Sequence, residues 1–109
     1  MTRSELIRQI ADSITEIDVL RSSIARGTSE RILLDELRDD LDTRVNRLSV
    51  RNFEENSRRY LEFTEAISDI NADLQVTIDD VNNIVTTINN LKRLVGAVDQ
   101  LIGIGRLIV

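Results

Sequence analysis

A hydrophobic repeat from Tyr60 to Gly105 constrains this chain more than any other feature. Apolar residues recur there at alternating steps of three and four, the spacing that places side chains on one face of an α-helix. Only Thr77 and Gly105 in this repeat lack a large apolar side chain. Such a long repeat is typical of a helix packed against other helices along a seam. The seam residues are Tyr60, Phe63, Ile67, Ile70, Leu74, Val81, Ile84, Ile88, Leu91, Val95, Val98 and Ile102.

The composition favours few, long helices. The chain has 109 residues, no proline and 4 glycines, of which three lie at or beyond Gly96. A small β-sandwich or barrel needs frequent turns, and those turns are rich in glycine and proline. Aromatic residues make up only 3% of the chain, so a core would consist of Ile, Leu and Val. We therefore predict an all-α fold, an elongated helical bundle or coiled coil in a single domain.

Local signals divide the chain into two short helices and one long C-terminal helix. The first helix is expected over residues 4–26, because Arg26 and Gly27 are favourable at a helix C-terminus. A turn at 27–29 follows, and Thr28 and Ser29 can cap a second helix over 30–48. The step between apolar residues is five from Leu48 to Phe53, where three or four is expected, which indicates a possible kink at 49–52. The third helix is expected over 53–102, at a length of roughly 75 Å.

The width of the apolar stripe predicts a bundle of three or more helices. Apolar residues such as Ile78 and Val85 flank the seam, and β-branched residues occupy positions where a two-stranded coil prefers leucine. Two short helices could leave part of the long seam uncovered, and uncovered apolar surface favours association. We expect a homo-oligomer, a complex with another helical protein, or both. The predicted function is a non-enzymatic structural or protein–protein interaction module that self-associates through the long seam.

Few residues in the chain are suited to catalysis or metal binding. There is no histidine and no cysteine, so the commonest general base and the softer metal ligands are missing. No phosphate-binding loop or nucleophile motif occurs. Carboxylates at 62, 65, 69, 73, 79 and 80 lie opposite the apolar stripe and are expected to form a solvated face. We predict no catalytic residues, no cofactor and no metal site.

The charge and hydropathy of the chain indicate whether nucleic acid or a membrane is an expected partner. The formal net charge is −5, and basic residues form no extended patch, so nucleic acid is not an expected partner. The first residues are polar and amphipathic, and no apolar run is long enough to cross a bilayer. These features predict a cytoplasmic protein.

The C-terminal segment 94–109 supports an alternative function. It is nearly all apolar, and one interpretation is that it forms the end of the bundle core, while another is that it rests on a membrane or another apolar surface. In the second case the protein would be a peripheral membrane or apolar-surface-binding protein. The contact residues would be Leu94, Leu101, Ile104, Leu107 and Ile108.

Overall fold

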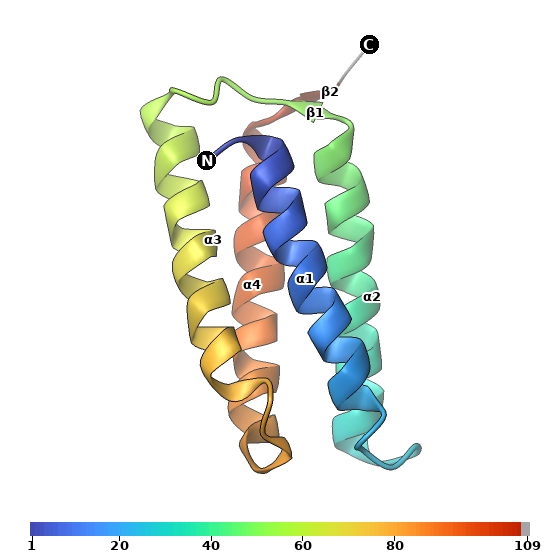
Figure 1. Cartoon of the computed structure of the whole chain (residues 1–109). Helices are drawn as coiled ribbons and strands as arrows, with labels where there is room; N and C mark the ends of the chain where they lie inside the picture. Colours follow the sequence, from blue (N-terminus) through green and yellow to red (C-terminus); the bar gives the residue numbers. More distant parts are fainter. Residues whose placement is uncertain (108–109) are drawn as a thin grey trace.

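Four α-helices pack side by side in the computed structural model, which describes residues 1–107 (Figure 1). They are α1 (Arg3–Arg21), α2 (Ser29–Ser49), α3 (Arg58–Thr77) and α4 (Ile84–Ile104). A single 3₁₀ turn, η1 (Val81–Asn83), precedes α4. Two short strands, β1 (Arg51–Asn52) and β2 (Arg106–Leu107), pair antiparallel. The prediction of an all-α fold is confirmed.

The helices alternate in direction but do not follow chain order around the bundle. α1 packs against α2 and α3, and α4 packs against the same two helices, so α1 and α4 lie diagonally opposite (Figure 1). The segment between α2 and α3 therefore crosses one end of the bundle, where β1 meets β2. The molecule measures 42 × 26 × 18 Å. It is much shorter than the long helix that the seam predicts.

The expected long helix over 53–102 is wrong, because the chain turns between α3 and α4. The Asp80 side chain accepts a hydrogen bond from the Asn82 backbone N–H at 2.9 Å, and Asn83 N–H donates to the Asp80 carbonyl. Short polar side chains of this kind compete with helical hydrogen bonds and favour turns. The elongated layout of two short helices and one long helix is thereby replaced by two antiparallel hairpins.

Two further boundaries differ from the expected ones. α1 ends at Arg21 rather than at residue 26, and the Ser22 hydroxyl donates to the Val19 carbonyl at 2.6 Å in place of helix continuation. Gly27 adopts a φ of 85°, which suits glycine. The region of the possible kink is a complete break: α2 stops at Ser49, and α3 begins only after its cap, Ser57.

The core is built from isoleucine and leucine of all four helices. Fully buried examples include Ile10 of α1, Leu41 of α2, Ile67 of α3 and Leu91 of α4. Each such side chain contributes about 1.5–3 kcal/mol to stability when it leaves water. The seam of 60–102 therefore packs largely against the rest of its own chain.

Polar side chains distinguish the two contacts of α1. Toward α2, the Arg38 guanidinium donates two hydrogen bonds to the Asp18 carboxylate, from Nε at 3.0 Å and from Nη2 at 3.3 Å. These bonds raise the pKa of Arg38. Toward α3, the Ser13 hydroxyl donates to Asn71 Oδ1 at 2.5 Å and accepts from Gln75 Nε2 at 3.0 Å. The α1–α3 contact is less extensive than the α1–α2 contact, and it is bridged by neutral hydrogen bonds where the α1–α2 contact has ion pairs.

Candidate functional site

Most of the predicted seam lies inside the bundle and is not a free surface. Val81 is the exception, at 44% exposed, because it falls in the η1 turn rather than on a helix. Four seam residues are partly buried and pack against the core: Phe63, Ile70, Ile84 and Val95. The buried seam residues are Tyr60, Ile67, Leu74, Ile88, Leu91, Val98 and Ile102.

The C-terminal segment belongs to the bundle as far as the structure describes it. Leu94 and Leu101 are fully buried, and Ile104 is partly buried against the core. The backbone of Leu107 pairs with Arg51 in the two-stranded sheet, and Ile108 lies outside the described residues. Leu94 and Leu101 are therefore unavailable to a membrane in this fold. No helix within residues 1–107 is long and apolar enough to span a bilayer.

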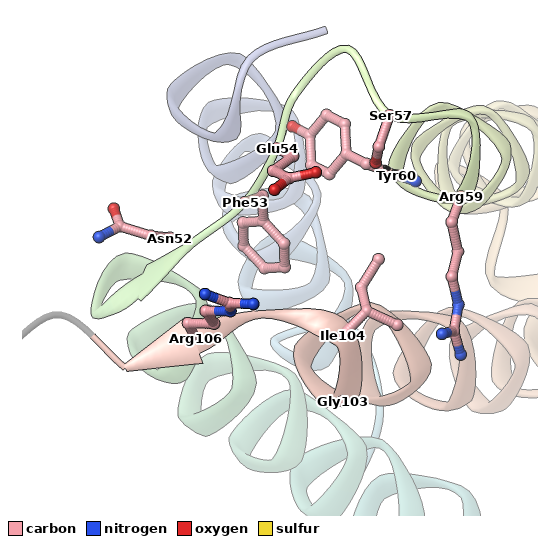
Figure 2. A pocket seen from close by; sticks show the side chains of 9 residues that line it. All are labelled: Asn52, Phe53, Glu54, Ser57, Arg59, Tyr60, Gly103, Ile104 and Arg106. Carbon is pink, nitrogen blue, oxygen red and sulfur yellow. Dashed lines mark hydrogen bonds between the residues drawn. The ribbon is translucent and has the colours of Figure 1, made fainter.

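A hollow of about 600 Å³ lies at the end of the bundle where the α2–α3 segment crosses (Figure 2). The Phe53 ring lies near its centre and packs on Tyr60, with the ring centroids 5.4 Å apart. Arg59 and Arg106 lie on opposite sides of Phe53, and Glu54 adds a carboxylate. This lining can hydrogen-bond to a polar group, but it pairs no nucleophile with a base.

Close packing fixes the shape of this end. A Cβ atom at Gly105 would lie 2.7 Å from Phe53 Cε1 and 3.1 Å from Arg51 Cβ, so only glycine lets β2 approach β1 so closely. The Arg3 guanidinium donates to the Arg51 carbonyl, and the Tyr60 hydroxyl donates to the Met1 carbonyl at 2.8 Å. The N-terminus, the crossing segment and the end of α4 are thus tied together.

Burial, with a contribution from the nearby Glu55 carboxylate, raises the pKa of Tyr60 to about 12. Neutral Tyr60 therefore stabilises the fold below about pH 10, and this contribution is lost as the pH rises through 12. Tyr60 is the only tyrosine and there is no tryptophan, so tyrosinate absorbance reports on this side chain alone. We expect a titration midpoint near 12 in the native protein and near 10 in denaturant. A native midpoint near 10 would contradict the burial of Tyr60.

A different surface combines exposed apolar side chains with few charges. α2 and α4 are parallel neighbours, and their N-terminal turns form a shallow groove of about 230 Å³. Val85 is 65% exposed there, and it lines the groove together with the buried Ile88 and the partly buried Leu33. We call this surface the α2–α4 face. Its lining residues are Ser29, Glu30, Leu33, Val85, Ile88, Asn89 and Lys92.

Glu30 and Lys92 are the two charged residues among those that line the α2–α4 face. The segment 81–91 contains no charged residue, in a chain in which 30% of residues are charged. Glu30 comes from α2 and Lys92 from α4, and neither forms an ion pair within residues 1–107. Depletion of charged residues is typical of the central part of protein–protein interfaces.

The sequence indicated only part of this face. Val85 is recognisable as an apolar residue flanking the seam, and the asparagines at 82, 83 and 89 are exposed and uncharged, whereas the asparagine at 90 is buried. Leu33 and Glu30 could not be assigned to it, because their contribution depends on α2 packing beside α4. The described residues contain no group of three or more His, Cys, Asp or Glu side chains that could hold a metal ion.

The chain was compared with protein-family models, with curated proteins and with solved structures, and none of them matches it.

Proposed function

We propose that this chain is a non-enzymatic protein-interaction module that associates with a second copy of itself through the α2–α4 face. The observation that carries the proposal is that the mostly exposed Val85 shares a groove with Leu33 and Ile88, next to a segment, 81–91, that has no charged residue. Covering exposed, uncharged apolar surface with a partner removes it from water, and this lowers the free energy of the complex. This proposal replaces the seam as the contact surface, since the seam residues are largely occupied within the chain.

The opposite charges of Glu30 and Lys92 favour a second copy of this chain as the partner that covers the α2–α4 face. In a two-fold symmetric dimer each subunit presents the same patch, so a residue at one edge can meet a different residue at the partner's opposite edge. Glu30 and Lys92 have opposite charges and lie on different helices of the groove. Such a dimer would form two equivalent Glu30–Lys92 pairs between subunits. Stable interfaces bury roughly 800 Å² of surface on each partner. One long side of this molecule, which measures 42 × 26 × 18 Å, is large enough to supply that area.

Replacing Val85 with aspartate tests the apolar centre of this face. Val85 lies in the first turn of α4 and is mostly exposed, so the fold tolerates a carboxylate there. We expect the dimer dissociation constant to rise at least about tenfold by sedimentation equilibrium. Leu61→Asp is the matched control, because Leu61 is exposed in the first turn of α3, away from the face. An equal effect of both changes, or a wild-type monomer throughout, would overturn the proposal.

Exchanging the charges of Glu30 and Lys92 tests the two-fold symmetric arrangement of the dimer. Lys92→Glu alone leaves like charges opposed and should weaken the dimer about threefold to tenfold. The double variant Lys92→Glu with Glu30→Lys restores the opposite charges and should recover most of that loss. No recovery in the double variant would rule out the Glu30–Lys92 pairing.

A further inference from the structure

A second groove lies on the opposite side of the bundle, between the C-terminal end of α1 and the turn that follows α3. Its volume is about 280 Å³, below most small-molecule pockets and suited to a few side chains of a larger partner. The buried side chains of Leu20 and Ile78 form apolar parts of its wall. Val19 and Val81 also line it and are 68% and 44% exposed. We call this surface the α1–α3 groove.

The groove exists because α1 and α3 separate toward this end. Ser13, near the middle of α1, bonds to Asn71 and Gln75 in the C-terminal half of α3. Beyond these bonds α1 leans toward α2, as Figure 1 shows, and Arg21 of α1 pairs with Asp35 of α2 at 3.1 Å. The last turn of α1 is therefore held by α2, and its α3-facing side stays uncovered.

Carboxylates line the groove, and no basic side chain of the described chain pairs with them. They belong to Glu16, Asp79 and Asp80, which form no ion pair within residues 1–107. Glu16 Oε2 is enclosed and has no hydrogen-bond partner in the same range. Burial raises the pKa of Glu16, and the nearby charge of Asp79 adds to this effect. A cation placed at this edge would relieve the repulsion between the carboxylates.

We infer that the α1–α3 groove is a docking site for a basic amphipathic polypeptide segment, one that presents apolar side chains on one face and lysine or arginine beside them. Its apolar side chains would lie between Val19 and Val81, over Leu20 and Ile78. Its cations would lie against Glu16, Asp79 and Asp80. The groove has an apolar wall and carboxylates without a basic partner within residues 1–107, so it favours a segment that is both apolar and basic. An acidic segment would not complement the carboxylates, and a purely polar segment would not complement the apolar wall. Self-association through the α2–α4 face is not required.

The inference is tested with a synthetic helical peptide of about 18 residues that carries leucine on one face and lysine elsewhere. Its fluorescence anisotropy is measured against the full chain. Two further peptides serve as probes. One has glutamate in place of lysine, and the other has the same composition in an order that gives no apolar face. We expect binding of the first peptide and at least about tenfold weaker binding of the other two.

Paired variants locate the site. Asp79→Asn with Asp80→Asn removes two carboxylates of the groove, and asparagine keeps the capping bond of Asp80 to Asn82. Glu65→Gln with Asp69→Asn removes the same charge from exposed positions of α3 outside the groove. We expect the first pair to weaken binding about threefold to tenfold and the second pair to change it less than about twofold. Equal losses would show non-specific attraction to an acidic protein and overturn the inference.

A third variant tests the apolar contribution. Val19→Ser with Val81→Ser leaves the charges intact and changes only exposed side chains, so circular dichroism should be unaltered. We expect this variant to bind the lysine–leucine peptide at least about fivefold more weakly than the unaltered chain does. Unchanged binding would mean that the groove's apolar lining is not used, which also contradicts the inference.

Discussion

Replacing Leu94 with aspartate is expected to unfold the bundle. Leu94 is fully buried on α4, the helix that packs against both α2 and α3. An unpaired carboxylate at that position loses its hydration and finds no cation, which costs several kcal/mol against a total stability of about 5–15 kcal/mol. Far-ultraviolet circular dichroism should show loss of most helical signal at neutral pH, or a transition at much lower urea concentration.

Val85→Asp is the control for this experiment, because it places the same carboxylate on the same helix at a mostly exposed position. We expect that variant to keep its helical signal. The comparison also separates two interpretations of the C-terminal segment. If Leu94 rested on an external apolar surface, Leu94→Asp would fold as well as Val85→Asp, and the burial of α4 in the core would be contradicted.

The second large effect is expected for Leu74→Ala on α3. Leu74 is fully buried and is part of the seam that α3 contributes to the core. Removing a buried isobutyl group and leaving a cavity costs about 2–5 kcal/mol, because neighbouring side chains relax only partly. The melting temperature should fall by roughly 10–25 °C for a domain of this size. Urea unfolding followed by circular dichroism measures the free energy directly.

Leu61→Ala makes the same chemical change on the same helix at an exposed position, 44% accessible. Its expected effect is within about 0.5 kcal/mol. Similar losses for Leu61→Ala and Leu74→Ala would mean that α3 does not present its seam to the core.

The sequence was informative about the core and misleading about its layout. Periodicity identifies Ile67, Leu74 and Leu91 as residues that pack against other helices, and all three are buried. The same periodicity runs unbroken through the turn, because Thr77, Val81 and Ile84 keep the steps of four and three residues. Hydrophobic spacing alone therefore cannot distinguish one long helix from two helices joined by a short turn.

A signal for this turn exists in the polar residues. Asp79, Asp80, Asn82 and Asn83 are four turn-favouring side chains within five positions, and Asp80 forms the bond that starts η1. Glycine and proline are absent there, which explains why the turn is easily missed. The end of α1 has a similar origin, since Ser22 bonds back to Val19 without a helix-breaking residue.

Neither proposed contact surface could be assembled from the sequence. The α2–α4 face joins Leu33 to Val85, and the α1–α3 groove joins Glu16 to Asp79, across long separations in the chain. Both depend on the diagonal placement of α1 and α4, which follows from the segment that crosses the end of the bundle. Helix amphipathicity shows which face of each helix is apolar, but not which helices become neighbours.

The most direct test is a distance measurement across the turn between α3 and α4, because that turn allows one chain to cover its own seam. The chain has no cysteine, so the double variant Glu65→Cys with Gln100→Cys can carry two spin labels at exposed positions. Pulsed electron spin resonance on labelled protein diluted with unlabelled protein gives the distance within one chain. Adjacent antiparallel helices predict about 15–30 Å, whereas a continuous helix predicts about 50 Å and would contradict the four-helix bundle.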